Sequence, residues 1–275
     1  MTKGVNKMYQ LIALDMDGTL LKEDKTISDR TKKAIYGARE KGVKVVLASG
    51  RPIEGLNRYL KELDLISQDD YVMSFNGSIV QNTETKQVIF KNILTGKDLK
   101  RLYELSKQIG VNIHAFTKKG CVTPVMNEYT QVEGRINGIE VHEVDYETIS
   151  EDEDVIKVMF IDPEPVLEEA IKRIPDSFYE DYTIVRSAPF FLEFLNKASS
   201  KGTGIKALGE YLGIAKEDII CVGDAGNDLD MIEYAGLGVA MGNAFEEVKQ
   251  AADYVTLTNE EDGVAHVIEK FIGIS

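Results

Sequence analysis

Short apolar runs alternate with helical patterns at both ends of this 275-residue chain, and that alternation constrains its fold more than any other feature. Residues 11–14 and 43–48 are continuous apolar runs, too short for amphipathic helices and typical of strands buried on both faces. The pattern predicts a helix after each of them, over residues 28–42 and 52–63, and a third strand over residues 71–75. Strands and helices in strict succession form right-handed βαβ units. An α/β fold is therefore predicted, a doubly wound parallel sheet with helices on both faces.

The middle of the chain has a different pattern. Strand and helix alternate again from residue 202 onward, whereas residues 85–189 mix helices with several short strands and turn clusters. That mixture is typical of a small α+β domain. We therefore predict one core built from residues 1–84 and 190–275, interrupted by an inserted domain at residues 85–189.

The charge and composition exclude several classes of protein. The formal charge is −14, from 32 Lys and Arg against 46 Asp and Glu, and no basic cluster offers a face for nucleic acid or anionic lipid. The hydrophobic fraction of 43% is that of an ordinary globular chain. The sequence shows neither the apolar stretch of a signal peptide nor an apolar run of membrane-spanning length. A cytoplasmic protein without nucleic-acid or membrane partners is predicted, and its oligomeric state stays open.

Two carboxylates stand where the first predicted strand ends, in the sequence Asp15-Met16-Asp17-Gly18-Thr19. Side chains two residues apart in an extended chain point to the same side, so Asp15 and Asp17 can converge while Met16 points away. In open α/β sheets, ligands bind at the carboxyl ends of the strands. Two carboxylates at one point repel each other unless a cation or a shared proton lies between them. A hard divalent ion such as Mg²⁺ is the favoured ligand.

That segment has two other interpretations. A calcium-binding EF-hand loop begins similarly, but the twelfth position from Asp15 is Thr26 instead of Glu, and a strand precedes the segment instead of a helix. The EF-hand is therefore excluded. A solvated acidic turn stays open for the segment taken alone, because a single Asp-x-Asp-Gly is common.

Polar groups also follow other predicted strands or begin predicted helices. Ser49-Gly50-Arg51 lies between the second strand and a helix, where a hydroxyl and free backbone N–H groups suit an anion. Lys201 begins a further helix, where its charge can reach a phosphate. Residues 223–228, Gly-Asp-Ala-Gly-Asn-Asp, follow another buried strand and add two carboxylates and an amide.

Each of these groups has a structural alternative. Ser49, Asp224 and Asp228 can cap helices, and Lys201 can be a solvated surface lysine. Their joint placement after successive strands is harder to explain by capping alone. We therefore favour a common site.

The charge balance of that site points to phosphate. Asp15, Asp17 and Asp224 carry about −3, while Mg²⁺ and Lys201 carry about +3, which leaves a nearly neutral site before substrate enters. A phosphate dianion is tolerated there only when the metal and Lys201 contact it directly.

In combination, these motifs resemble those of the haloacid dehalogenase superfamily of phosphohydrolases. Its motifs are matched in order by Asp-x-Asp-Gly-Thr at residues 15–19, Ser49, Lys201, and Gly-Asp-x-x-Asn-Asp at residues 223–228. Residues 231–244 read Met-Ile-Glu-Tyr-Ala-Gly-Leu-Gly-Val-Ala-Met-Gly-Asn-Ala and resemble the Cof-type (IIB) subfamily of sugar-phosphate phosphatases.

The resemblance implies a role for each motif residue. Asp15 would attack phosphorus and form an aspartyl-phosphate, and Asp17 would protonate the leaving oxygen and then activate water. The expected ligands of Mg²⁺ are the Asp15 carboxylate, the backbone carbonyl of Asp17 and Asp224, with Asp228 in a supporting position. The expected contacts to the phosphoryl oxygens come from Met16, Ser49, Gly50, Lys201 and Asn227.

The resemblance also gives the inserted domain a role. The sequence between Asp15 and Ser49 is too short for a domain, so the insertion at residues 85–189 would be a cap of the C2 type. Such a cap is expected to roof the site and to choose the leaving group.

The predicted function is Mg²⁺-dependent hydrolysis of small phosphorylated metabolites, above all sugar phosphates. The sequence does not identify the metabolite. Two alternatives stay open: a phosphomutase with the same site, and a non-enzymatic protein, either a switch phosphorylated on Asp15 or a sugar-phosphate sensor. Asp17 argues against the switch, because an acid/base beside the nucleophile shortens the lifetime of an acyl phosphate.

Weaker signals concern the edge of the site. Asn76-Gly77 directly follows the third strand and is either a simple turn or part of the site's edge. In the inserted domain, Tyr129 and Arg135 are candidates for substrate contact, although such residues are more often solvated. Glu193, between two apolar residues, is a candidate for closing the cavity. The three histidines show no metal-ligand spacing, and no Ser–His–Asp triad can be assembled.

Overall fold

The computed structural model describes residues 8–274, and the chain divides into two compact units. The core unit combines Met1–Lys91 with Ser200–Ser275, and the inserted unit is Asn92–Ser199. The predicted divisions, after residues 84 and 189, both lie earlier in the sequence. The reason is strand pairing: β5 (Val88–Lys91) still pairs within the core sheet, and β12 (Phe191–Asn196) still pairs within the inserted sheet.

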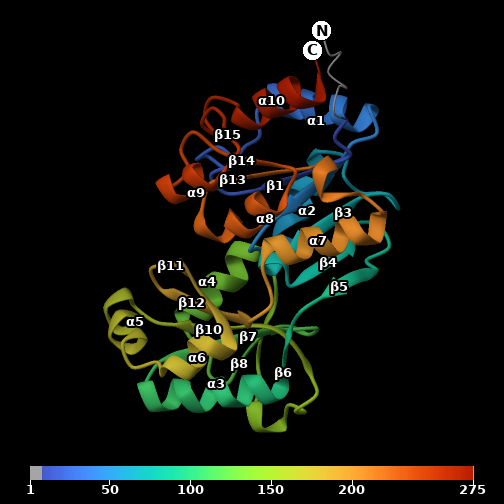
Figure 1. Ribbon diagram of the computed structural model, residues 1–275. Helices are drawn as coiled ribbons and strands as arrows, with labels where there is room; N and C mark the ends of the chain where they lie inside the picture. Colours follow the sequence, from blue (N-terminus) through green and yellow to red (C-terminus); the bar gives the residue numbers. More distant parts are fainter. Residues whose placement is uncertain (1–7, 275) are drawn as a thin grey trace. The chain divides into compact units, whose positions relative to one another are not determined.

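The described part of the core unit contains one sheet with the strand order β15-β14-β13-β1-β2-β3-β4-β5 (Figure 1). Its other strands are β1 (Leu11–Asp15), β2 (Lys44–Ala48), β3 (Tyr71–Ser74), β4 (Ile79–Asn82), β13 (Ile219–Gly223), β14 (Leu237–Ala240) and β15 (Tyr254–Val255). All neighbours from β15 to β3 are parallel, and β4 and β5 add an antiparallel edge. Short turns suffice for that edge, because antiparallel strands need no crossover helix.

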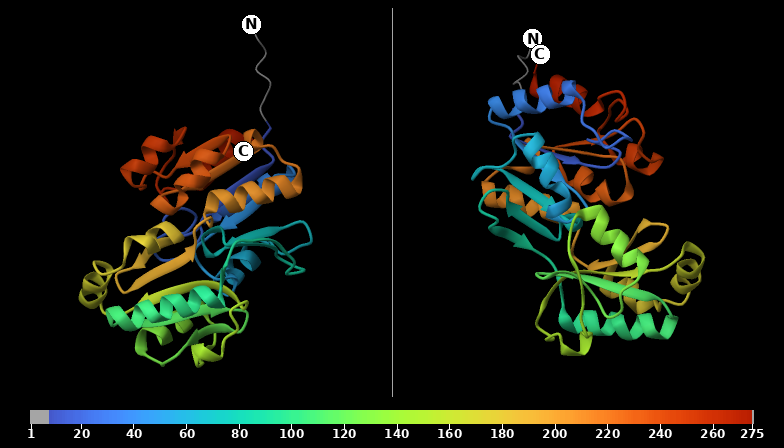
Figure 2. Two further views of the ribbon diagram at one scale, coloured as in Figure 1. Left: turned by 60° about the horizontal axis from the view of Figure 1, so that its bottom comes forward. Right: turned by 180° about the vertical axis from the view of Figure 1, so that it is seen from behind.

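Helices cover both faces of the core sheet, which confirms the doubly wound α/β fold (Figure 2). Successive residues of β1 point to opposite faces. Ile12 and Leu14 pack against α1 (Asp29–Glu40), α2 (Ile53–Glu62), α9 (Glu246–Ala251) and α10 (Gly263–Val267). Leu11 and Ala13 pack against α7 (Lys201–Leu212), and α8 (Leu229–Tyr234) contributes to both clusters. A π-helical turn, η5 (Ile268–Ile272), continues α10.

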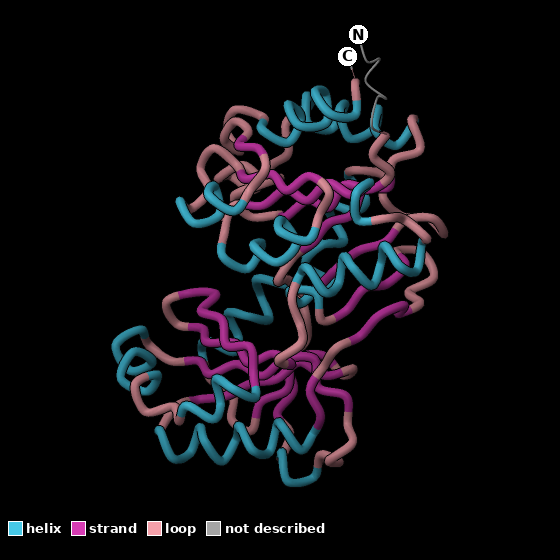
Figure 3. The backbone as a smooth tube through the Cα atoms, viewed as in Figure 1, coloured by secondary structure: helices cyan, strands magenta, loops and turns pink. Residues whose placement is uncertain are grey.

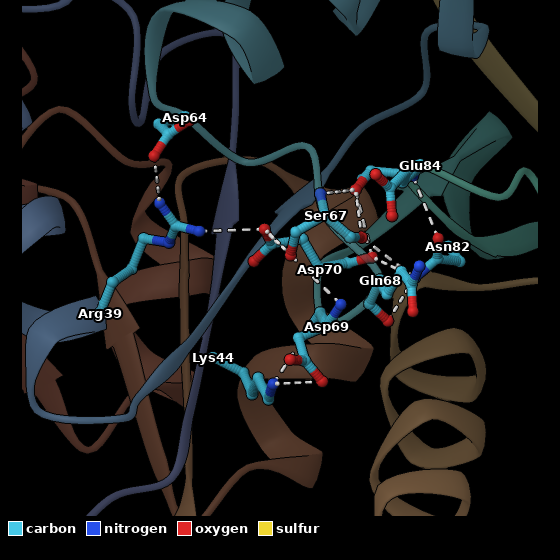
Figure 4. A network of polar contacts seen from close by, with 10 residues as sticks. Arg39, Lys44, Asp64, Ser67, Gln68, Asp69, Asp70, Asn82 and Glu84 are labelled. Atoms are coloured by element: carbon cyan, nitrogen blue, oxygen red, sulfur yellow. Dashed lines mark hydrogen bonds and ion pairs between the residues drawn. The ribbon is translucent and has the colours of Figure 1, made fainter.

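A polar network fixes the loop that enters β3 (Figure 4). Arg39 at the end of α1 donates to Asp64 and to the buried carboxylate of Asp70, with N–O distances of 3.4 and 3.0 Å. Asp70 also accepts from the Ser67 hydroxyl at 2.7 Å. The Asn82 amide of β4 donates to the backbone carbonyl of Asp70 at 3.0 Å. These bonds hold the start of β3, the strand whose far end leads into the candidate site.

The inserted unit consists of a second sheet and helices (Figure 3). Its described strands have the order β11-β12-β10-β7-β8-β9, with β6 beside β10. Its strands are β6 (Leu94–Thr95), β7 (Asn112–Thr117), β8 (Gly120–Thr123), β9 (Val141–Glu143), β10 (Asp154–Ile161), β11 (Tyr182–Ala188) and β12. Its helices are α3 (Gly96–Ile109), α4 (Glu128–Asn137), α5 (Glu164–Ile171) and α6 (Asp176–Asp181). Side chains from α3, α5 and α6 form its apolar cluster with the sheet. No helix within residues 8–274 combines the length and the apolarity needed to cross a membrane.

Candidate active site

The carboxyl ends of adjacent parallel strands bring three predicted carboxylates together. Asp15 ends β1, and Asp224 directly follows β13, which is the neighbour of β1 in the sheet. Asp228 ends the short turn η4 (Gly226–Asp228) after that strand. Each of the three offers a carboxylate oxygen, and these oxygens all lie within 4.8 Å of one another. Segments more than 200 residues apart in sequence thus form one acidic cluster.

Lys201 is the cation of this cluster. Its side chain is fully buried, and its Nζ lies 2.5 Å from an oxygen of Asp15 and 2.6 Å from an oxygen of Asp228. The backbone of α7 holds it in place, because Ser200 caps this helix and forms reciprocal bonds with Thr203. This burial excludes the alternative of a solvated surface lysine.

Burial and mutual charge shift the ionisation of these groups. Burial and the charge of Asp228 raise the pKa of Asp15 well above its usual range, although Lys201 opposes the shift. Burial alone would lower the pKa of Lys201, but the charges of Asp15 and Asp228 outweigh burial and raise it. The pKa of Asp224 is also raised by burial, against a hydrogen bond from Thr19. Lys201 is therefore a permanent cation among carboxylates that repel one another.

Asp228 shapes the loop after β13. Its carboxylate accepts the backbone N–H groups of Asp224 and Ala225 at 2.9 and 3.0 Å, in addition to the Lys201 ammonium. A Cβ on Gly223 would lie 2.4 Å from the Cβ of Asp228, so only glycine leaves room for this turn. Asp228 thus stabilises this turn, and one of its oxygens also belongs to the acidic cluster.

Gly18 and Thr19 hold Asp224 from the other side. The Thr19 hydroxyl donates to Asp224 at 2.7 Å. Gly18 has φ +87°, and a Cβ there would come within 2.4 Å of an Asp224 oxygen. The sequence pattern predicts no role for Thr19, although its place in the first motif is a signal for one.

The predicted phosphate-binding residues lie beside this cluster. The buried Ser49 hydroxyl accepts the backbone N–H of Arg51 at 3.1 Å. A Cβ on Gly50 would meet the Asn76 amide at 3.1 Å, so Asn76 lies directly against this loop. The Asn227 amide donates to the Asn76 side chain at 3.0 Å. Asn76 therefore links the loop after β2 with the loop after β13 and is more than a simple turn.

Gly77 lies against the start of α7. It belongs to the turn η1 (Phe75–Gly77) and has φ +86°. A Cβ at this position would lie 2.0 Å from the backbone oxygen of Ser200. The absence of a side chain at Gly77 therefore lets the residue before Lys201 approach the turn after β3.

Asp17 and Met16 do not belong to the acidic cluster. The Asp17 side chain is 44% exposed and pairs with Arg51 and Lys25. Burial would raise the pKa of Asp17, but the hydrogen bond from Lys25 and the charge of Arg51 lower it. Met16 is fully buried in the apolar core, so a contact with phosphate is left to its backbone. The sequence pattern predicts no role for Lys25 or for the Arg51 side chain.

The acidic cluster suits a divalent cation. Three carboxylates against the single ammonium of Lys201 leave a formal charge of about −2. The donors are all oxygens, which are the ligands that Mg²⁺ prefers. Lys201 donates hydrogen bonds to Asp15 and Asp228, and Asp224 accepts a hydrogen bond from Thr19.

The three candidates in the inserted unit lie in unlike surroundings. Tyr129 packs near the Phe190 ring, with 5.6 Å between centroids, and Arg135 is exposed on α4. Glu193 is buried and pairs with the equally buried Lys157 at 3.1 Å. Glu193 is thus part of an internal ion pair of this unit.

Comparisons with known proteins show what this chain is similar to. The family model for haloacid dehalogenase-like hydrolases matches residues 12–268. YxeH of Bacillus subtilis (strain 168) is 44% identical over 267 residues, which cover 96% of this chain and 99% of YxeH. A solved haloacid dehalogenase-like hydrolase from Bacteroides thetaiotaomicron has a TM-score of 0.84 and 36% identity, and covers 95% of this chain and 99% of its own. The structure of the HAD subclass IIB sugar phosphatase BT4131 has a TM-score of 0.78 and 29% identity, over 96% of this chain and 100% of its own.

Proposed function

The chain belongs to the haloacid dehalogenase-like hydrolases and is a phosphatase, and from this membership we propose that it hydrolyses small phosphorylated metabolites, above all sugar phosphates, with Mg²⁺. The observation that carries the proposal is the cluster of Asp15, Asp224 and Asp228 around the buried Lys201. Relatedness to a sugar phosphatase supports the substrate class.

Two carboxylates divide the chemistry. A carboxylate oxygen of Asp15 attacks phosphorus, and the bond between phosphorus and the ester oxygen breaks as Asp17 gives that oxygen a proton. The product is an alcohol and a phosphorylated Asp15. Water then attacks phosphorus while Asp17 takes back a proton, which releases inorganic phosphate and restores the Asp15 carboxylate.

The surrounding residues hold the phosphoryl group. Lys201 faces the attacking oxygen of Asp15, so its charge opposes the growing charge of the transferred group. The Ser49 hydroxyl, the Gly50 backbone and the Asn227 amide, with the Met16 backbone, supply the further donors that the phosphoryl oxygens require.

Asp15, Asp224 and the backbone carbonyl of Asp17 would hold the metal, with Asp228 in support. Bound there, Mg²⁺ neutralises the excess negative charge of the cluster and lowers the repulsion of the substrate's phosphate. The chain's own contribution is to keep these carboxylates fixed, through Thr19, Lys201 and the turn that Asp228 closes.

Phosphate release from a panel of phosphorylated metabolites, with Mg²⁺ or with EDTA, tests the proposal. We expect release from hexose phosphates that EDTA abolishes. Asp15→Asn should lower the rate by about 10³-fold or more, because it removes the nucleophile, while circular dichroism stays unchanged.

Three results would contradict the proposal. They are release that is unaffected by EDTA, full activity of the Asp15→Asn variant, and accumulation of an isomeric sugar phosphate instead of free phosphate. The last result would favour a phosphomutase.

A further inference from the structure

Two cations hold the carboxylate of Asp17 from outside the acidic cluster. The Arg51 guanidinium donates from Nε to one oxygen at 2.9 Å and from Nη2 to the other at 2.7 Å. Lys25 donates to the second of these oxygens at 2.8 Å. A fork of two parallel bonds fixes the plane of a carboxylate, whereas a single ammonium fixes only a distance. Arg51 is therefore the group that sets the orientation of Asp17.

Arg51 is itself fixed by the loop after β2. Its backbone N–H donates to the Ser49 hydroxyl at 3.1 Å, and its carbonyl accepts the N–H of Phe75 at 3.1 Å. Its guanidinium lies 5.8 Å from the centre of the Tyr59 ring, and only 23% of its side chain is exposed. Tyr59 is buried on α2. The guanidinium thus extends from a rigid support toward a carboxylate that is itself 44% exposed.

The support of Arg51 is shared with the proposed phosphate site. Ser49 and Gly50, proposed to contact the phosphoryl oxygens, immediately precede Arg51. One three-residue segment therefore reaches both the transferred group and the residue that moves the proton. A fixed distance between these two functions is what proton transfer to a leaving oxygen requires.

We propose that Arg51 is the positioning residue of the acid/base Asp17. The fork holds the ionised carboxylate; when Asp17 takes up a proton, one oxygen leaves the fork, and the bond to the other oxygen keeps the carboxyl group at the orientation needed to reach the leaving oxygen. This inference rests on the proposed function. Arg51 acts through Asp17, so its loss matters most where the leaving group needs a proton. An alkoxide from a sugar phosphate needs that proton, whereas the nitrophenolate from p-nitrophenyl phosphate leaves without it.

Single-turnover measurements with both esters distinguish this positioning role from a role of the Arg51 charge in phosphate binding or a role of Arg51 in stability. For Arg51→Ala with Mg²⁺, we expect the maximal rate of alcohol release from a hexose phosphate to fall about 10²-fold. Nitrophenol release should fall by less than about 5-fold, and the half-saturating ester concentration should change little. Arg51→Lys should restore only part of the alcohol release, because an ammonium cannot form the fork.

Lys25→Met is the matched control. It removes one cation from the same carboxylate but leaves the fork, so its loss of alcohol release should be well below that of Arg51→Ala. In an Asp17→Asn background, Arg51→Ala should add no further loss for the hexose phosphate.

Equal losses for the two esters would overturn the inference, because they would indicate a role in phosphate binding or folding. So would an unchanged rate in Arg51→Ala, or a full additional loss in the Asp17→Asn background. If Arg51→Ala does not fold, Arg51→Lys takes its place in the test. A larger loss of alcohol release than of nitrophenol release would then support the inference, and equal losses would overturn it. Wild-type protein without Mg²⁺-dependent release from either ester would instead contradict the proposed function.

Discussion

His114 shows at the level of one residue how burial controls ionisation. It is fully buried in the inserted unit, where its ring nitrogens lie 3.2 Å from the Thr130 hydroxyl and 3.1 Å from the Met159 sulfur. Burial, with a smaller contribution from the charge of Lys157, lowers the pKa of His114 to about 3. The histidine is therefore a neutral structural residue, and no metal-binding role is needed to explain it.

This lowered pKa predicts a loss of stability in acid. Between pH 6.5 and about 3, the unfolded chain binds a proton at His114 that the folded chain does not bind. The stability is fully present above pH 6.5 and falls as the pH is lowered, by about 2 kcal/mol at pH 5. Denaturant unfolding at pH 7 and pH 5 should show this difference between wild type and His114→Gln.

The control is His142→Gln, which changes a more exposed histidine of the same unit. It should retain the wild-type drop between the two pH values. A drop of equal size in His114→Gln and wild type would show that His114 does not cause the acid sensitivity.

The residues of the site divide into those that the sequence could predict and those that it could not. Asp15 and Asp224 were predictable, because the ends of parallel strands meet at one edge of a sheet. The burial of Lys201 was not, since a lysine at a helix start is usually solvated. The fork from Arg51 to Asp17 depends on side-chain directions, which strand and helix patterns do not contain.

At the level of elements, the contact between η1 and α7 controls the position of Lys201. The turn after β3 comes so close to Ser200 that Gly77 has no room for a side chain. The backbones of η1 and of the start of α7, which are far apart in the sequence, are thus in direct contact.

Gly77→Ala should therefore damage both stability and activity. Its φ of +86° costs an alanine roughly 1–2 kcal/mol, and the clash with the Ser200 oxygen raises the loss to about 3 kcal/mol or more. Phosphate release should fall as well, because Ser200 directly precedes Lys201 and its displacement would move the lysine. Thermal unfolding and phosphate release measure the two effects.

Gly213→Ala is the matched control in the same unit. Gly213 ends α7 with φ +69°, but nothing lies within 4 Å of a Cβ there. It should cost only the roughly 1–2 kcal/mol of the backbone and leave the rate unchanged. Equal effects of the two substitutions would show that the contact with Ser200 is unimportant.

The elements themselves were largely predictable, and their grouping into units less so. The apolar runs of β1 and β2 and the helices after them follow from periodicity. The antiparallel strands β4 and β5 carry no comparable signal: β5 is at most half-buried. The sequence pattern therefore could not locate the boundary between the core unit and the inserted unit, which follows β5.

For the molecule as a whole, the acidic cluster joins the two sequence segments of the core unit electrostatically. Asp15 comes from the first segment, and Asp224 and Asp228 come from the second. The single charge of Lys201 does not cancel their mutual repulsion, which opposes folding when no divalent ion is bound, in a chain of net charge −14. A divalent ion bound there should hold both segments together.

Mg²⁺ should therefore raise the melting temperature, by an amount equivalent to about 2.7 kcal/mol at 100 times its Kd. Asp224→Asn should abolish this gain. Without Mg²⁺ the same variant should be more stable than wild type, because burial and Asp228 raise the pKa of Asp224, and a neutral amide avoids that repulsion.

Asp181→Asn makes the same change in net charge on the inserted unit, where Asp181 pairs with Arg101 at the surface. It should keep the full gain from Mg²⁺. A gain in Asp224→Asn as large as that of wild type would show that the ion binds elsewhere.

The pairing of Leu11 with Ile219 has a consequence for biosynthesis. A ribosome translates β1 before the insertion, but its partner β13 is translated only after the whole insertion. The inserted unit is continuous in sequence and can fold while the nascent chain is still growing. Asp15 must wait for Lys201 and Asp224, so the acidic cluster can assemble only after the segment that follows the insertion has been translated.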